Sequence, residues 1–260
     1  MDLDLEGRTY IVTGGSRGLG LATARVLAHE GARLVIAGRD QATLTHAHDE
    51  LQAVFGAEVT TVAADLADPG TADRLVARAH EEFGRLDGAL VSVGGPPAGG
   101  FLDVTDDQWQ AAFGSVFLGT VRVMRAVARA LESEEHGDGG AIAAVLSSSV
   151  KAPVANLAVS NGLRPGLAMA LKTLADEVGP RGVRVNGLLP GRIDTDRLRE
   201  LDGGAPDPAA ARAGHEAAIP LRRYGRPDEF GRMAAFVLSP AASYLTGAMI
   251  PLDGGLTRAL

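Results

Sequence analysis

The chain contains no cysteine and few aromatic residues. Its 260 residues include no Cys, one Trp and three Tyr, and aromatic residues make up only 4% of the total. The absence of cysteine excludes disulfides, thiolate nucleophiles and metal sites with Cys ligands. The shortage of tyrosine is equally informative, because any catalytic phenol must come from Tyr10, Tyr224 or Tyr244.

Signals for membranes, secretion and nucleic acids are also lacking. No apolar run approaches the roughly 20 residues that a spanning helix needs. Residues 1–7 carry three acids and no apolar core, which excludes a signal peptide there. The net charge of −7 gives no global attraction for nucleic acid or an acidic membrane. The six histidines are scattered, so we predict no metal site and expect a cytoplasmic protein.

What the sequence does have is a regular alternation of short apolar runs and helical patterns. The runs predict strands at 9–13, 33–37, 59–63, 88–93, 141–146, 183–188 and 248–252. The helical patterns cover 19–29, 42–54, a segment ending near 83, 105–131, 167–178 and 227–238. Residues 133–140 are predicted as a turn and 202–210 as a mobile loop. This alternation predicts one α/β domain, residues 1–260, built from parallel strands with right-handed crossovers.

A glycine-rich turn joins the first strand to the first helix. Glycines at this place permit a tight turn and let a pyrophosphate approach the backbone, while the helix N-terminus offers free N–H groups. We therefore predict dinucleotide binding. The residues assigned to it here are Gly14, Ser16, Arg17, Gly18, Leu19 and Gly20.

The spacing Gly-x-x-x-Gly-x-Gly resembles that of the short-chain dehydrogenase/reductase family. Further stretches agree along nearly the whole chain, among them Ser147 after the fifth strand and Asp253-Gly254-Gly255 near the end. The resemblance implies a doubly wound Rossmann-type sheet of order 3-2-1-4-5-6-7, a substrate lid at about 193–220, and a homotetramer, with a dimer as the second choice. It also implies further cofactor contacts from Asp65, Leu66, Gly94, Pro190, Gly191, Ile193 and Thr195.

The second strand indicates which nucleotide is preferred. NAD-binding folds usually place an acid there to bind the ribose 2′-hydroxyl. In this chain the position is Gly38, and Arg39 follows it. Together with Arg17, Arg39 can pair with a 2′-phosphate, so we predict NADP(H) in preference to NAD(H). Two ordinary surface arginines are the alternative, and the neighbouring Asp40 could weaken the preference.

The family's catalytic residues are only partly present. The resemblance implies a serine, a tyrosine, a lysine four residues after it, and an asparagine on the long helix. Ser147 fits the serine, but Ser160 stands at the tyrosine position and Arg164 at the lysine position. The asparagine position is Val116. We assign Ser147, Ser160, Arg164 and Lys151 as the candidate catalytic residues.

These replacements change the available acid–base chemistry. A serine hydroxyl titrates far too high to replace a tuned phenol, and an arginine stays charged, with a pKa above about 12. Arg164 can thus hold a ribose or an anionic substrate but cannot shuttle protons. Lys151 could donate a proton, although a lysine exposed on a loop is the alternative. Ser160 and Asn161 would help Ser147 to orient the substrate.

Three functions remain open at this level. The first is an NADP(H)-dependent oxidoreductase that acts on a small carbonyl or imine with altered proton transfer, the proton coming from water, Lys151 or the substrate. The second is an inactive nucleotide-binding relative that serves as a sensor or partner protein. The third is non-redox chemistry, such as elimination or isomerisation, on the same scaffold.

Overall fold

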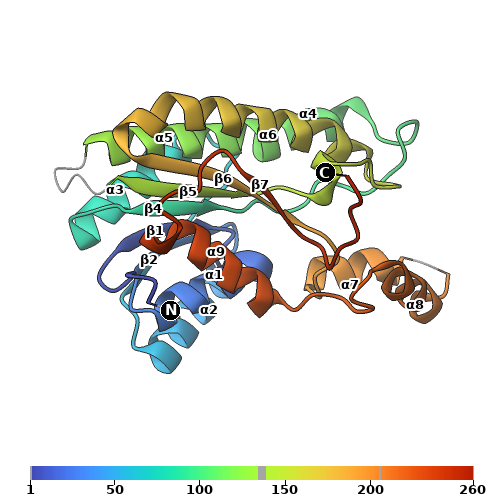
Figure 1. Ribbon diagram of the computed structural model, residues 1–260, viewed down its shortest axis with the longest axis horizontal. Helices are drawn as coiled ribbons and strands as arrows, with labels where there is room; N and C mark the ends of the chain where they lie inside the picture. The colour runs from blue at the N-terminus through green and yellow to red at the C-terminus, as the bar shows by residue number, and fades with distance from the viewer. Residues whose placement is uncertain (1, 134–138, 205, 260) are drawn as a thin grey trace.

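A parallel sheet of seven strands lies between two layers of helices (Figure 1). The computed structural model describes residues 2–133, 139–204 and 206–259. The strand order is β3-β2-β1-β4-β5-β6-β7, and every pairing is parallel, which confirms the predicted topology. The strands are β1 Thr9–Thr13, β2 Arg33–Gly38, β3 Val59–Ala63, β4 Gly88–Val91, β5 Gly140–Val145, β6 Val183–Pro190 and β7 Met249–Leu252.

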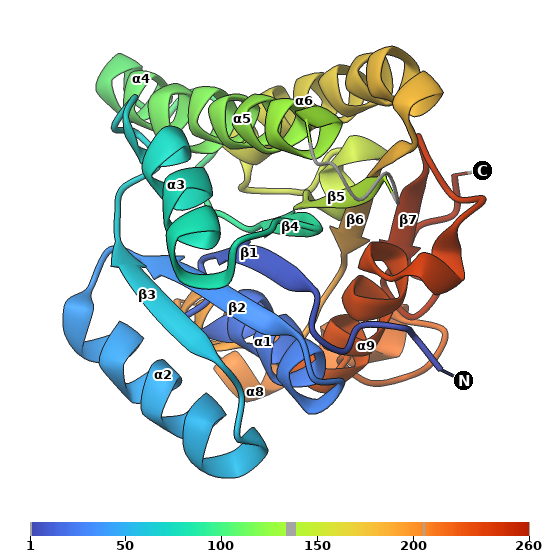
Figure 2. The ribbon, with the colours of Figure 1, turned by 90° about the vertical axis from the view of Figure 1, so that its left-hand side faces the viewer.

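Helices cover both faces of the sheet because its central strands are apolar on both sides. Helices α3, α5 and α6 pack on one face, and α1, α2 and α9 on the other (Figure 2). The helices are α1 Gly18–His29, α2 Gln41–Phe55, α3 Thr71–Phe83, α4 Asp106–Ala112, α5 Gly119–Ser133, α6 Ala158–Val178, α7 Asp196–Gly203, α8 Pro208–Ala218 and α9 Pro227–Leu238.

Helices α4 and α5 are joined by a π-helical segment, Phe113–Leu118, into one long rod. A capping box begins α4, because the Thr105 side chain accepts from the Gln108 N–H and the Gln108 side chain accepts from the Thr105 N–H. The rod, Asp106–Ser133, is long and apolar enough to cross a membrane by length and composition. Its apolar side instead packs on the sheet, where Val123 and Val127 are buried.

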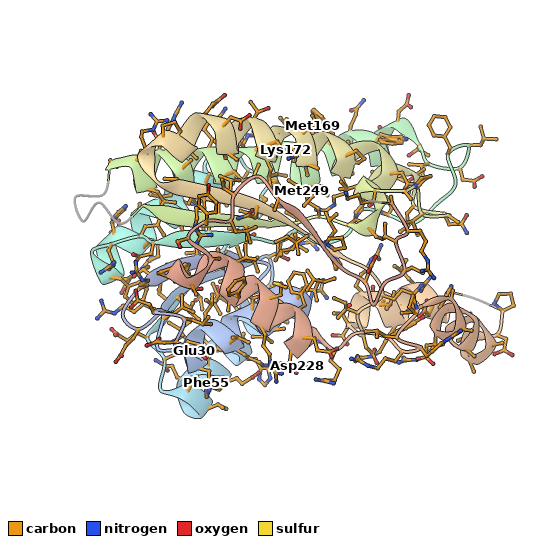
Figure 3. The ribbon with its side chains drawn as sticks, viewed as in Figure 1. Glu30, Phe55, Met169, Lys172, Asp228 and Met249 are labelled. Carbon is orange, nitrogen blue, oxygen red and sulfur yellow. The ribbon has the colours of Figure 1, made fainter. Side chains whose placement is uncertain are left out.

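Helix α6 begins nine residues before the predicted start at Leu167, which corrects that prediction. Pro165 lies inside α6, where it cannot donate a backbone hydrogen bond. Burial of Val159, Leu163 and Leu167 outweighs the cost of one missing hydrogen bond. On the outer side of α6, Lys172 donates to the Gly247 carbonyl at 2.9 Å and ties the helix to the chain before β7 (Figure 3).

The segment predicted as a mobile loop at 202–210 is largely helical, which corrects that prediction. Gly203 ends α7, and Pro208 begins α8 with Asp207 accepting from two backbone N–H groups as its cap. These two helices project from the carboxyl edge of the sheet (Figure 1). They occupy most of the segment proposed as a lid. Of the predicted turn at 133–140, residues 134–138 lie outside the described residues.

Candidate functional site

The site begins where β1 and β4 end side by side. The Thr13 hydroxyl donates to the Ser92 carbonyl and accepts from the Ser92 N–H, both at 2.8 Å. The strand order reverses between these two strands, since β2 follows β1 on one side and β4 lies on the other. In open α/β sheets this switch point, at the carboxyl ends of the strands, is where ligands bind.

The glycine-rich turn has the close contacts that a nucleotide cradle requires. Gly14 and Gly18 adopt positive φ values of 60° and 57°. A Cβ at Gly14 would lie 2.8 Å from the Ser92 carbonyl oxygen, and one at Gly20 would overlap the Gly14 carbonyl. Arg17 precedes α1 without capping it through its side chain, and Leu19 lies in the first turn. The N–H groups of that turn are therefore available to an anion.

Opposite the turn, the start of the β4 loop leaves room for a ligand. A Cβ built on Gly94 meets no heavy atom within 4 Å, and Gly94 is exposed. The Thr195 methyl is the nearest group to Gly18, at 3.9 Å from a built Cβ. The residues present thus fit a dinucleotide, with a tight glycine cradle on one side and open space on the other.

Two arginines near the end of β2 are expected to set the preference between NADP(H) and NAD(H). Arg17 and Arg39 are both exposed, and a Cβ on Gly38 would lie 2.9 Å from the Ser16 hydroxyl oxygen. Asp40 caps α2 by accepting from the Thr43 N–H at 2.8 Å, and it is close enough to Arg17 for the two charges to interact. Bonds from Thr43 hold the pKa of Asp40 below its usual value.

The other predicted cofactor residues line the same edge. Asp65 accepts from the Ala67 N–H, and Leu66 supplies the carbonyl that a Cβ on Gly119 would approach to 2.6 Å. Pro190 ends β6, and a Cβ on Gly191 would lie 2.5 Å from the Asp253 Cβ. Ile193 is buried and pairs with Gly225, and Thr195 precedes α7.

Three serines gather at the carboxyl end of β5. Ser147 caps the short 3₁₀ turn Ser148–Val150, its hydroxyl accepting from the Ser149 N–H at 3.1 Å. The Ser149 and Ser160 hydroxyls lie 3.1 Å apart, and both side chains are buried. Ser147 and Ser160 were predicted from the sequence, whereas Ser149 was not. The only sequence signal for Ser149 is the run of three serines, which does not show which hydroxyl turns inward.

Arg164 lies one helical turn after Ser160 and is buried, with 4% of its surface exposed. Its guanidinium donates to the Val145 carbonyl, the last residue of β5, at 2.6 Å. Within the part of the chain that the structure describes, no carboxylate lies within 4.0 Å of it. Burial lowers the pKa of Arg164 to about 10, so it remains charged at neutral pH.

Asn161 and Lys151, which were also predicted to act in the site, belong to the loop beside it and to its attachment to α6. The Asn161 amide accepts from the Val154 N–H and donates to the Val154 carbonyl, both at 2.9 Å. This pairing fastens the loop 151–157 to α6, so Asn161 is structural. Lys151 is half-buried and ends the 3₁₀ turn that Ser147 begins.

None of the three tyrosines stands in for a catalytic phenol. Tyr10 is buried in β1, and its hydroxyl reaches the Leu238 carbonyl at 3.5 Å. Tyr244 is fully exposed. Tyr224 is buried and donates to Asp202 at 2.8 Å. Burial raises the pKa of Tyr224, as does its bond to Asp202.

Polar contacts hold α7 and α8 against the sheet edge. Arg197 on α7 donates to the Pro96 carbonyl at 2.8 Å, which spans from the lid segment to the β4 loop. Beneath it, His215 accepts from Arg192 at 2.8 Å through Nε2, because a guanidinium can only donate. The His215 Nδ1–H then donates to the Tyr224 hydroxyl at 3.0 Å.

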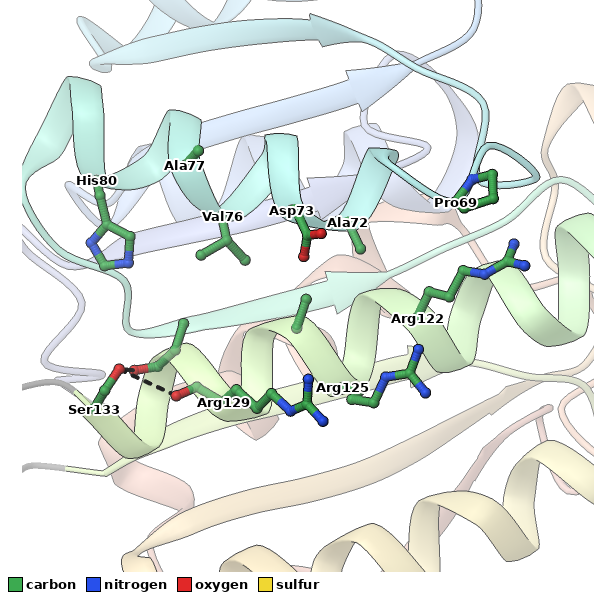
Figure 4. A pocket seen from close by; sticks show the side chains of 12 residues that line it. Pro69, Ala72, Asp73, Val76, Ala77, His80, Arg122, Arg125, Arg129 and Ser133 are labelled. Atoms are coloured by element: carbon green, nitrogen blue, oxygen red, sulfur yellow. Dashed lines mark hydrogen bonds between the residues drawn. The ribbon is translucent and has the colours of Figure 1, made fainter.

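A cavity of about 620 Å³ opens elsewhere, between α3 and α5 (Figure 4). Arg122, Arg125 and Arg129 line it from α5, with Asp73 and His80 facing them from α3. It lies in the helix layer, away from the glycine cradle and the three serines. We therefore place the candidate site at the carboxyl edge of the sheet and not in this cavity.

Comparisons with known proteins match nearly the whole chain. A family model described as "Enoyl-(Acyl carrier protein) reductase" matches residues 14–257. L-rhamnose 1-dehydrogenase (NAD(P)(+)) of Azotobacter vinelandii is 36% identical over 256 residues, 97% of each chain. L-sorbose reductase of Gluconobacter frateurii, solved with NADPH and L-sorbose, superposes with a TM-score of 0.92 at 30% identity over 100% of both chains.

A third relative is a short-chain oxidoreductase of Pseudomonas aeruginosa PAO1, described as containing an atypical catalytic center. It is 29% identical, covers 99% of this chain and 100% of its own, and superposes with a TM-score of 0.90. The fold, the glycine cradle and these matches agree along the chain. The chain belongs to the short-chain dehydrogenase/reductase family of NAD(P)-dependent oxidoreductases.

Proposed function

We propose that this protein is an NADP(H)-dependent oxidoreductase that acts on a small carbonyl or imine without a tyrosine acid. The observation that carries the proposal is the buried group of Ser149, Ser160 and Arg164 beside an intact glycine cradle. The glycine cradle would bind the nucleotide, and the serines and Arg164 would contact the substrate, but no tyrosine is present to act as the acid.

The cofactor would be held by backbone N–H groups of the glycine turn and by the two arginines at the end of β2. Arg17 and Arg39 form no ion pair within the described residues, and Asp40, whose charge interacts with that of Arg17, is engaged as a helix cap. Both guanidiniums are thus available to a 2′-phosphate. The full set is Gly14, Ser16, Arg17, Gly18, Leu19, Gly20, Arg39, Asp65, Leu66, Gly94, Pro190, Gly191, Ile193 and Thr195.

When bound, NADP(H) would supply the hydride or accept it. The chain's own residues then orient the substrate and stabilise the charge that develops on its oxygen or nitrogen. The Ser147 hydroxyl is half-buried and can donate to that atom, and the fixed charge of Arg164 stabilises it electrostatically. The proton comes from water, from Lys151, or from an imine that already carries one.

The named relatives support an enzyme. L-sorbose reductase was solved with NADPH and its sugar, and L-rhamnose 1-dehydrogenase uses NAD(P)(+), as their names state. The Pseudomonas oxidoreductase with an atypical catalytic center offers a precedent for departure from the usual residues. The alternative of an inactive sensor is not favoured by these comparisons.

The test is NADPH oxidation, followed by absorbance near 340 nm, over a panel of carbonyls and imines. We expect turnover with some members, and Ser147→Ala should reduce kcat by about 100-fold or more, as loss of one hydrogen-bond donor to a developing negative charge does. Ser115→Ala, on the π-helical segment, serves as a matched control and should leave kcat unchanged. Turnover that survives Ser147→Ala would overturn the assignment of Ser147.

A further inference from the structure

Arg164 is a buried cation with little internal compensation. An arginine carries five N–H donors, and the contacts of Arg164 with described residues use one of them, toward Val145. The half-buried Arg184 contrasts with it. Its guanidinium donates to four backbone carbonyls, those of Val237, Leu238, Ser239 and Leu245.

Such an arrangement is unfavourable in the free protein. Moving a charge out of water costs several kcal/mol unless an opposite charge or a full set of acceptors offsets it. Desolvation lowers the pKa of Arg164, and no carboxylate acts against that shift. The group nevertheless keeps its charge at neutral pH, so the site carries a permanent positive charge with N–H donors to spare.

The position of this charge is at the reacting end of the site. Ser160 and Arg164 are four residues apart on α6 and therefore share one face of the helix. Ser160 contacts Ser149, and Arg164 contacts the last residue of β5. Ser147 follows that strand within two residues. The guanidinium thus lies at the carboxyl end of β5, the same strand end that Ser147 follows, two strands away from the glycine cradle after β1.

We propose that Arg164 binds a carboxylate and that the substrate is a small 2-oxo acid, or the corresponding imino acid. This inference rests on the proposed function. A carboxylate neutralises the buried charge and matches the forked geometry of a guanidinium, whereas the uncharged hydroxyls of a cofactor ribose would not neutralise it. A carboxylate one bond from the reacting carbon would hold that carbon at the serines.

The corresponding reduction balances with groups already named. Hydride from NADPH bonds to the carbonyl carbon, and the π electron pair of the C=O bond moves onto oxygen. A proton from water completes the 2-hydroxy acid, leaving NADP⁺ and hydroxide. Arg164 changes no bond and acts by position and charge alone.

The experiment is calorimetric binding of pyruvate and phenylpyruvate, each against its methyl ester, to the protein saturated with NADP⁺, which cannot reduce them. At least one acid should bind about tenfold tighter than its ester, a difference of about 1.4 kcal/mol. The ratio of the ester's dissociation constant to that of the acid should fall to about one in Arg164→Met and should remain above one in Arg164→Lys. Arg125→Met, on the exposed side of α5, should leave it unchanged.

Thermal unfolding without ligand supplies a second readout. Arg164→Met should raise the Tm, because it removes a buried uncompensated charge, whereas a purely structural arginine would lower it. Equal binding of acid and ester, an unchanged preference in Arg164→Met, or a lowered Tm would each overturn the inference. Failure of the wild-type protein to bind NADP(H) would instead overturn the proposed function. In that case, binding of the acid and of its ester would be compared on the protein without cofactor.

Discussion

At the scale of single residues, we expect the nucleotide preference to depend on two exposed arginines. Arg39 follows β2 directly, and Arg17 lies in the turn before α1. Asp40, an acid beside them, is engaged as a cap on α2. We therefore expect a 2′-phosphate to be favoured at this corner.

Arg39→Asp should shift the preference from NADPH toward NADH. A charge-assisted hydrogen bond contributes about 1.5–3 kcal/mol, so the ratio of the two dissociation constants should change by about 10- to 100-fold. Calorimetry with each cofactor measures that ratio. The control is Arg129→Asp, an exposed arginine on α5, which should not alter it. An unchanged ratio in Arg39→Asp would remove the basis for the NADP(H) preference.

At the scale of elements, α6 carries both Ser160 and Arg164 although a proline lies beside them. Pro165 cannot donate to the carbonyl of Asn161, one turn earlier. The helix persists because its apolar side packs on the sheet. The missing hydrogen bond at Pro165 destabilises α6 close to the site, and the packing of its apolar side on the sheet offsets that cost.

Pro165→Ala should stabilise the protein, since it restores the hydrogen bond that proline removes. Proline costs about 3 kcal/mol in a helix interior relative to alanine, and the greater freedom of the unfolded alanine variant offsets part of this. We expect a gain of about 1–3 kcal/mol in chemical denaturation. A loss of stability would mean that the proline ring supplies packing that outweighs its missing donor.

The lid segment contains a pH-sensitive contact. His215 is neutral when it accepts from Arg192 and donates to Tyr224, while Asp202 bonds both Arg192 and Tyr224. Burial lowers the pKa of His215, as does the adjacent Arg192, against the opposing effect of Asp202. The folded state therefore binds a proton less readily than the unfolded chain. The contribution of this network to stability is complete above about pH 6.5 and is lost as the pH falls below it.

Hydrogen exchange over residues 196–218 should show this loss. Between pH 7.5 and 5.5 the wild-type segment should lose protection relative to His215→Gln, whose amide can accept and donate in the same places without titrating. Comparing the two proteins at each pH removes the intrinsic pH dependence of exchange. Parallel profiles would show that His215 does not control the segment.

At the scale of the whole molecule, the sheet could be predicted almost completely. Each strand is a short apolar run, and a helical pattern follows each of the first six, which predicts parallel strands with right-handed crossovers. The strand order was implied by the resemblance to the family. The errors concern α6 and α7–α8, where burial and capping decide the structure and local propensity does not. The same limit explains the site: Ser147 and Ser160 follow from spacing, whereas Ser149 depends on how one turn folds.

We propose that the protein assembles as a homotetramer. Met169 on α6 and Tyr244 near the C-terminal end are both exposed, consistent with surfaces that a neighbouring subunit would cover. We expect a homotetramer in light scattering at micromolar concentration. A dimer would favour the second choice, and a monomer would exclude both.

We infer that hydride transfer occurs in this site although the tyrosine is missing. NADPH that carries deuterium at the transferring position tests this inference when it is incubated with the carbonyl and imine panel and the products are analysed by mass spectrometry. At least one product should gain a single deuterium, in amounts equal to the NADPH consumed. Tight NADPH binding without consumption or label transfer across the panel would contradict it and leave a nucleotide-binding protein without redox chemistry.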